Sequence, residues 1–150
     1  MTIEIRLTID DASILKALSD PALVAGPINT FMKKAASVVQ LRAVELVPVD
    51  TGRLRSSITQ EVAPLRGRVF TNVEYAPHVE LGTRPHIIKA RRARALAGWQ
   101  WKGEDVIVKS VHHPGTKPKP FMRPALEQNR GRIDDLLQDA GREIEEKWRR

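Results

Sequence analysis

The chain has 150 residues, of which 41% are hydrophobic and none is cysteine. This length and composition suit one folded domain over residues 1–150, and they exclude a disulfide framework and a thiolate metal site. The alternating start MTIEIRLTID lacks the features of a signal peptide, and no apolar run approaches the ~18 residues that a membrane helix needs. We therefore expect a protein of cytoplasmic origin without a membrane partner.

The basic charge of the chain is concentrated in one segment. The formal net charge is +7, and the stretch from Arg84 to Arg123 holds ten Lys or Arg residues and two acids. The rest of the chain holds 15 bases and 16 acids, so the whole excess lies in this stretch. Such a segment is either a solvated surface or a surface that faces a polyanion or an acidic partner.

The N-terminal third is expected to hold a strand and two helices. Apolar and polar residues alternate over residues 2–9, which is typical of a strand with one buried face. A short helix with apolar residues at 14, 15 and 18 follows, and the stretch SDPALVAGP then interrupts the helical pattern. A long helix is predicted from about Pro27 to Leu46. Pro48 ends it, because proline disfavours helix in the residue before it.

The remaining elements are predicted in the same way. Two strands, Leu54–Ala63 and Gly67–Val73, flank the turn PLRG, and the short helix Glu74–Gly82 is stopped by its glycine. Residues 86–112 hold three β-like pieces, and Phe121–Trp148 has the apolar stripe of one long helix. The fold class is therefore α+β, with a small antiparallel sheet packed against two long helices and a β-hairpin-like insertion at about 84–114.

The residue patterns of enzymes and metal sites are weak in this chain. No pair of its four histidines has the helical spacing of a zinc motif, and the tripeptide Asp50-Thr51-Gly52 lacks the apolar residues that follow it in aspartic proteases. Zinc-finger spacing and clustered aromatic residues for base stacking are also missing. We expect no enzymatic activity, no cofactor and no metal. The basic charge still allows the protein to contact a nucleic-acid backbone without reading its sequence.

Two stiff basic turns, GTRP and HPGTKPKPF, enclose the basic segment. Glycine supplies unusual backbone angles and proline fixes the exit from each turn, so we expect the turns to hold a restrained β arm rather than to be ordinary connecting loops. The basic residues of the arm would face DNA or, in the ring that the family resemblance described next implies, the acidic end of a neighbouring subunit, at Glu143, Glu145 and Glu146. The candidate contact residues are Lys89, Arg91, Arg92, Arg94, Lys109, Lys117 and Lys119, and Pro85 is a further turn residue.

Four pieces occur in order: VDTGRLRSSI, TNVEYAPHVELGTRPHII, VKSVHHPGTKPKPFMRPAL and the C-terminal helix. This combination resembles the lambdoid-phage gene-product-ten-like family of tail-component and tail-completion proteins, over roughly residues 25–145. The motif positions are Asp50, Thr51, Gly52, Leu54, Tyr75, Ala76, His78, Glu80, Gly82, Thr83, His113, Pro114, Gly115, Thr116, Pro120, Phe121, Pro124, Ala125 and Leu126.

The resemblance implies a structural virion protein of the head–tail neck of a long-tailed phage. It implies a ring, expected to hold six copies, around the DNA channel, and a monomer or weak oligomer in dilute solution. The implied partners are further copies, head-completion or connector proteins, tail-terminator or tail-tube proteins, and packaged DNA. Stopper, completion and terminator layers all remain open, and the alternative is a free-standing basic nucleic-acid-binding protein.

Overall fold

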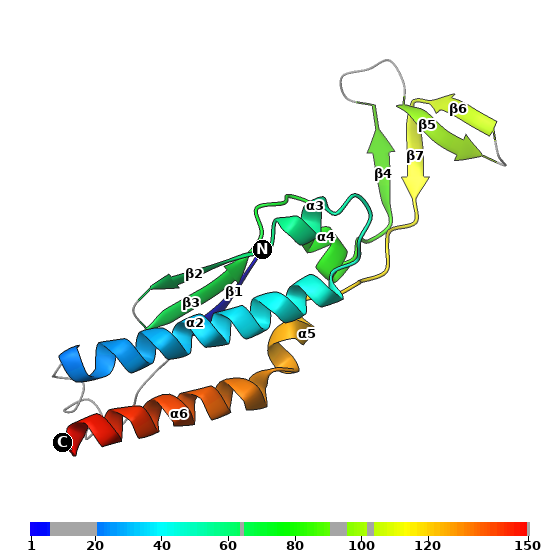
Figure 1. Ribbon diagram of the computed structural model, residues 1–150. Helices are drawn as coiled ribbons and strands as arrows, with labels where there is room; N and C mark the ends of the chain where they lie inside the picture. Colours follow the sequence, from blue (N-terminus) through cyan, green and yellow to red (C-terminus); the bar gives the residue numbers. More distant parts are fainter. Residues whose placement is uncertain (7–20, 64, 91–95, 102–103, 150) are drawn as a thin grey trace.

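The computed structural model describes residues 1–6, 21–63, 65–90, 96–101 and 104–149. Two long helices lie side by side under a small three-stranded sheet, and a β arm projects from the opposite end of the molecule to the C-terminus (Figure 1). The predicted α+β class and the predicted β insertion are therefore confirmed. The predicted short helix between the first strand and the first long helix lies outside the described residues.

The three-stranded sheet consists of β1 (Thr2–Arg6), β2 (Thr59–Ala63) and β3 (Arg66–Phe70), in the order β1-β3-β2 and antiparallel throughout. Thr2 and Thr59 both pair with Phe70, on opposite sides of β3. The predicted first strand is thus confirmed over the part that the structure describes. The predicted β2–β3 hairpin is also present, with Ala63 paired to Arg66 across its turn.

Residues 53–56 form a short helix, α3 (Arg53–Ser56), where a strand was predicted to begin at Leu54. Gly52 precedes it with φ +80°, and the Ser56 amide donates to the Gly52 carbonyl oxygen at 3.0 Å. The hydroxyl of Ser57 donates to the Leu54 carbonyl oxygen at 2.7 Å. Serine hydroxyls that bond to carbonyls three residues back favour a helical turn over a strand, and the buried Leu54 side chain anchors it.

The long helix α2 (Pro21–Leu46) begins earlier than predicted and includes Pro27 in its interior. An interior proline costs about 3 kcal/mol because it removes a hydrogen bond and crowds the preceding turn. Here Pro27 is itself fully buried, and neighbouring Val24 and Ile28 are buried in contact with the C-terminal helix. This packing offsets the local penalty. The predicted end of α2, just before Val47 and Pro48, is confirmed.

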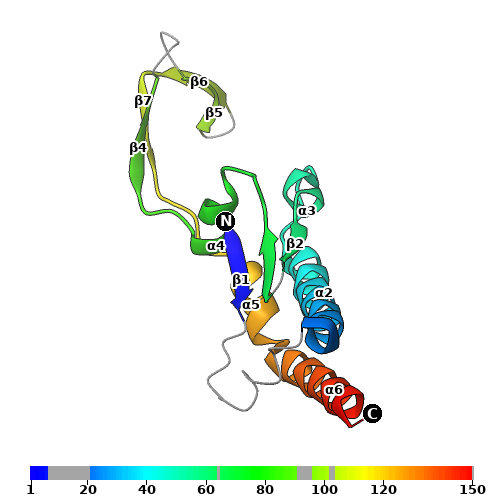
Figure 2. The same ribbon diagram turned by 90° about the vertical axis from the view of Figure 1, so that its left-hand side faces the viewer.

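The short helix α4 (Ala76–Leu81) is confirmed, and Gly82 with φ +70° ends it. The arm then begins, and we use this name for residues 84–114. Figure 2 shows that its strands rise away from the helices and the three-stranded sheet.

The arm contains two two-stranded antiparallel ribbons. The first joins β4 (His86–Lys89) to β7 (Ser110–His113), and the second joins β5 (Leu96–Trp101) to β6 (Glu104–Val108). One continuous strand was predicted for the third β piece. The chain instead divides it at Lys109, because β6 pairs with β5 whereas β7 pairs with β4.

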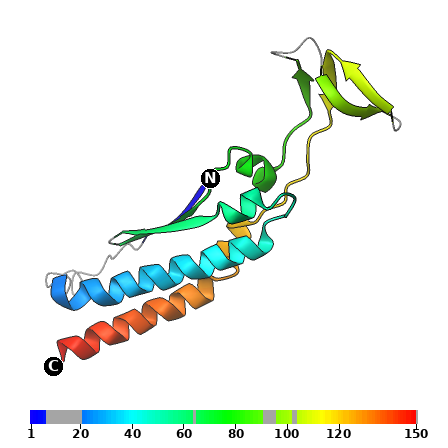
Figure 3. The same cartoon turned by 45° about the horizontal axis from the view of Figure 1, so that its top comes forward.

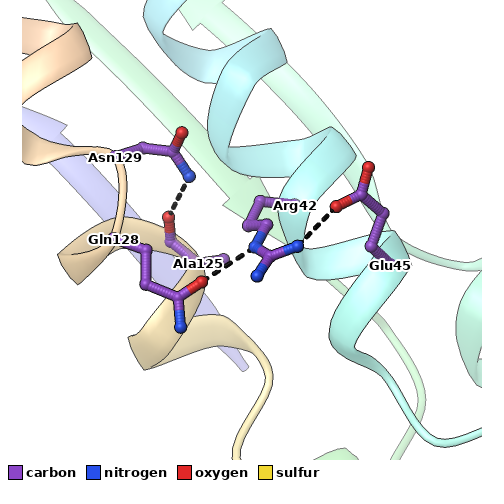
Figure 4. Close-up of polar contacts among 5 residues, drawn as sticks. All are labelled: Arg42, Glu45, Ala125, Gln128 and Asn129. Atoms are coloured by element: carbon purple, nitrogen blue, oxygen red, sulfur yellow. Dashed lines mark hydrogen bonds and ion pairs between the residues drawn. The ribbon is translucent and has the colours of Figure 1, made fainter.

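The predicted single C-terminal helix is two helices, α5 (Met122–Glu127) and α6 (Arg130–Trp148). Figure 4 shows the polar contacts at the break. The Asn129 side-chain amide donates to the Ala125 carbonyl oxygen at 2.9 Å, while its backbone N–H donates to Leu126. The side chain thus takes the place of the amide that would continue the helix.

Arg42 on the neighbouring helix α2 also contacts the residues at this break. Its Nε donates to Gln128 Oε1 at 2.8 Å, and its guanidinium also pairs with Glu45 at 2.7 Å (Figure 4). Arg42 is half-buried, and its contacts here are polar. The break lets α5 and α6 pack against different parts of α2.

The core has two adjoining parts. One surrounds Phe121 and Val69, and it joins α5 to the C-terminal half of α2 and to the sheet. The other joins α6 to the N-terminal half of α2 around Phe31 and Ala140. Phe121 has no exposed surface, as predicted, whereas Trp148 was predicted to continue the apolar stripe of α6 but is 65% exposed.

Candidate functional site at the root of the arm

Three segments that are far apart in the sequence meet where the arm joins the rest of the molecule. They are the loop from Pro48 to Gly52, the α4 region from Tyr75 to Thr83, and the returning chain from His113 to Lys119. Together with His86 and Ile88 they line an open cleft of about 770 Å³, which we call the root cleft. Nine of the nineteen sequence motif positions therefore line one cleft in the structure.

The lining of the root cleft combines an apolar surface with a basic rim. The apolar side chains are Pro48, Val49, Leu54, Val79 and Ile88, with Tyr75 beside them. The polar side chains are Asp50, Thr51, His78, Thr83, His86, His113, Thr116, Lys117 and Lys119. Such a mixture is typical of a surface that binds an apolar group and orients it through polar contacts.

The two glycine turns bind each other and close the base of the arm. The Thr83 amide donates to the Thr116 carbonyl oxygen at 3.0 Å, and the Thr116 amide donates back to Thr83 at 3.1 Å. A Cβ atom on Gly82 would lie 2.5 Å from the Thr116 oxygen, and one on Gly115 would lie closer still to the Thr83 oxygen. Gly82 and Gly115 also have positive φ. Each position therefore requires glycine for two reasons, its backbone conformation and the lack of space for a Cβ atom.

Glu80 connects α4, which precedes the arm, to the start of α5, which follows it. This carboxylate is 3% exposed and accepts the backbone N–H groups of Phe121, Met122 and Arg123 at 2.7, 3.0 and 3.0 Å. These amides belong to the first turn of α5, where the helix itself offers them no acceptor. Because Glu80 lies on α4, just before the first glycine turn, both ends of the arm are fixed to one buried group.

Two histidines pair across the ribbon just above this base. His86 lies opposite His113 in the β4–β7 register, with ring centroids 5.0 Å apart. The Gly115 amide donates to His113 Nδ1 at 3.0 Å, so this nitrogen is an acceptor and the second turn is held to the ribbon. No cluster of three metal-ligating side chains occurs among the residues that the structure describes.

The predicted basic contact residues are spread along the arm and its root. Lys89 and Lys109 lie on or beside the β4–β7 ribbon, and Lys117 and Lys119 lie at the root cleft; all four are exposed. Within the described parts of the chain none of the four forms an ion pair. Arg91, Arg92 and Arg94 lie outside the described residues.

Apart from Gly82 and Gly115, which form the two glycine turns, the predicted turn residues divide into three groups. Asp50, Thr51, Gly52, Thr83 and Thr116 line the root cleft. Pro85 and Pro114 line a second, smaller hollow on the ribbon. The exposed Pro120 leads into the buried Phe121, which belongs to the core.

Sequence reasoning did not single out the apolar lining, namely Val49, Val79 and Ile88. The alternation in HIIK does place Ile88 on the same face as His86, but only the fold brings that face opposite α4.

The basic arm is thus joined to the rest of the molecule by backbone hydrogen bonds beside an apolar cleft. Residues 13–82 match the family model described as "Bacteriophage HK97-gp10, putative tail-component". The resemblance inferred from the sequence motifs is thereby confirmed, and the match supports a structural role in a phage tail. Neither the curated proteins nor the solved structures contain a match to this chain.

The family match covers α2, α3, the β2–β3 hairpin and α4, and it ends at Gly82 where the arm begins. The family match therefore does not include the segment around HPGTKPKPF. The resemblance of that segment to the family is inferred from its sequence motif alone. None of the described helices is both long enough and apolar enough to cross a membrane.

Proposed function

We propose that this protein is a structural subunit of the head–tail junction of a long-tailed bacteriophage, of the tail-completion or connector type. In this proposal six copies form a ring around the DNA channel of the virion neck and help to join heads to tails. The family match to phage tail components supports the tail-related part of this role. The observation that carries the rest is the hydrogen-bonded root of the arm, built from Thr83, Thr116 and Glu80.

An arm whose direction is set before assembly favours the joining of subunits. Ordering a loose segment during binding costs free energy, and a preformed arm avoids that cost. The arm lies at one end of an elongated molecule and the C-terminus lies at the other, as Figure 3 shows. Different surfaces at the two ends suit a head-to-tail contact, which closes into a ring when the rotation between copies permits it.

The test is a phage that lacks this gene, complemented from a plasmid. Without the protein, DNA-filled heads and complete tails are expected to accumulate unjoined, and the wild-type gene is expected to restore infectious particles. A reconstruction of the neck should show a six-fold layer that contains the protein. Normal joining in its absence, or its location in a twelve-fold layer, would contradict the proposal.

The exposed lysines of the arm form no ion pair with any residue that the structure describes, and they support one alternative, a free-standing protein that binds the nucleic-acid backbone. This alternative predicts DNA affinity that falls steeply with salt, because each phosphate contact releases counterions. A matched control replaces Lys33 and Lys34, which are exposed on α2, instead of Lys89 and Lys109. Loss of DNA binding in the arm variant alone, together with normal head–tail joining, would favour the alternative.

A further inference from the structure

The glycine turn at Gly115 is held to the β4–β7 ribbon by a ring nitrogen of His113. The Gly115 amide donates to His113 Nδ1 at 3.0 Å, so this nitrogen carries a free electron pair. A neutral imidazole meets this requirement only when its proton is on Nε2. The charged form of histidine has a proton on each nitrogen, and it cannot make this contact.

The histidine on the opposite strand has the reverse arrangement. His86 Nδ1 lies 2.9 Å from the Arg84 carbonyl oxygen, and because a carbonyl oxygen only accepts, the proton of His86 is on Nδ1. His86 can therefore take up a second proton at Nε2 and keep this hydrogen bond. Protonation breaks the turn contact of His113 but leaves the Arg84 contact of His86 in place.

The groups around His113 determine what a positive charge on it would meet. Its ring centroid lies 5.0 Å from that of His86. The other titratable or charged side chains near the root are Asp50 in the loop after α2, His78 and Glu80 on α4, Arg84 before β4, and Lys117 and Lys119 after the Gly115 turn. Glu80 is buried and accepts the amides of α5, so Asp50 is the one carboxylate among the described residues that line the cleft. A charged His113 is therefore repelled mainly by bases.

The turn that His113 holds is also one half of the base of the arm. Gly115 precedes Thr116, which pairs with Thr83 through backbone hydrogen bonds in both directions. Release of the Gly115 amide removes the contact that holds this turn to the end of β7. The Thr83–Thr116 pairing then loses its support on that side, and the arm loses part of its attachment to the body.

We propose that His113 is a pH-dependent switch at the root of the arm. Neutral His113 binds the Gly115 amide and keeps the turn closed, and protonated His113 releases it. Because the open turn binds a proton that the closed turn excludes, a lower pH shifts the equilibrium toward the open turn. Histidine changes its charge between about pH 5 and 8, so a mildly acidic solution is sufficient. This switch is a property of the single molecule and does not depend on the proposed role in the neck.

The position of the proton on each ring is the first test. At about pH 8, the imidazole nitrogen chemical shifts of the purified protein should show a proton on Nε2 of His113 and on Nδ1 of His86. His112, which is exposed on the opposite face of β7, serves as the internal comparison. A proton on Nδ1 of His113 at this pH would refute the proposal, because that nitrogen could not accept the Gly115 amide.

Hydrogen exchange measures the opening of the turn. Between about pH 8 and 5, the Gly115 amide should lose protection by about tenfold or more, measured relative to an unstructured peptide at the same pH, as histidine passes from mostly neutral to mostly charged. The Thr83 and Thr116 amides should lose protection to a smaller extent. Val69, which is fully buried in the three-stranded sheet, reports whether the body remains folded. Unchanged protection of Gly115 over this range would contradict the proposal.

Asparagine at position 113 separates the hydrogen bond from the charge. His113→Asn supplies an amide oxygen that can accept the N–H group two residues on, as asparagine does in turns, and it does not titrate. This variant should keep the Gly115 amide protected at both pH values, whereas the matched control His112→Asn should respond to pH as the natural chain does. A response that persists in His113→Asn, or that is lost in His112→Asn, would assign the switch to another group and overturn the proposal. The two measurements on the natural chain decide the question even if a variant fails to fold.

Discussion

The packed body of this protein and its arm are stabilised in different ways. In the body, side chains such as Met32, Val39 and Phe121 have no exposed surface. In the β4–β7 ribbon every described side chain is at least partly exposed, and the strands are joined mainly by backbone pairing. A two-stranded ribbon is at best marginally stable in water, so the arm depends on its root for its direction.

We therefore expect the body to determine the stability of the molecule and the arm to determine its contacts during assembly. Substitutions in the body should lower the free energy of unfolding of the whole molecule. Substitutions at Glu80, Gly82 or Gly115 should release the arm, and substitutions along the arm should affect only its contacts.

Phe121→Ala should lower the free energy of unfolding by about 3–5 kcal/mol, because it leaves a cavity where a fully buried ring was packed. Chemical denaturation of the purified protein measures this change. Leu41→Ala is the control, since Leu41 is 65% exposed and its truncation should change stability by about 0.5 kcal/mol or less. Equal effects of the two substitutions would show that Phe121 does not anchor the body.

Glu80→Gln should cost about 1–3 kcal/mol, because one carboxylate oxygen is replaced by an amide that cannot accept a hydrogen bond. The Phe121, Met122 and Arg123 amides should then exchange faster with solvent, since Glu80 is their acceptor. Glu74→Gln is the matched control, because Glu74 is exposed. Unchanged exchange at these three amides would argue against Glu80 as the link between α4 and α5.

Gly115→Ala should open the base of the arm with a smaller effect on the body. Its φ of +87° costs a residue with a Cβ about 1–2 kcal/mol, and the added methyl group would also collide with the Thr83 carbonyl oxygen. Hydrogen exchange at the Thr83 and Thr116 amides should rise by about tenfold, since 1.4 kcal/mol corresponds to that factor.

Gly131→Ala is the internal control for that substitution. Gly131 lies in α6 with open space around it, so alanine there should stabilise the protein by about 0.5–1 kcal/mol. Protection of Thr83 and Thr116 that survives Gly115→Ala would mean that the turns do not depend on each other.

Replacement of Lys89 and Lys109 by serine should change the unfolding free energy by less than about 0.5 kcal/mol, because both side chains are exposed. It should nevertheless lower the yield of joined particles in the complementation assay, counted by electron microscopy. Serine at Arg91, Arg92 and Arg94 should have the same effect, and serine at Lys33 and Lys34 is the control. Normal particle yields from both arm variants would show that these basic residues are not part of the docking surface.

Local sequence signals determined a large part of this fold. Pro48 marked the end of α2, Gly82 marked the end of α4, and the turn after Ala63 marked the β2–β3 hairpin. Proline and glycine restrict or extend backbone angles at their own positions, so their effects can be read without knowledge of distant contacts. The buried position of Phe121 followed equally from the apolar stripe that begins there.

Only the tertiary structure decided the features that depend on residues far apart in the chain. Pro27 stays helical because α6 buries the surface around it, and the C-terminal helix breaks at Asn129 where Arg42 holds Gln128. The root cleft depends on the approach of Thr83 to Thr116 and of Glu80 to the start of α5. The Asn129–Ala125 hydrogen bond is local, but the other contacts join segments more than 30 residues apart, beyond the few residues over which backbone propensity and periodicity act.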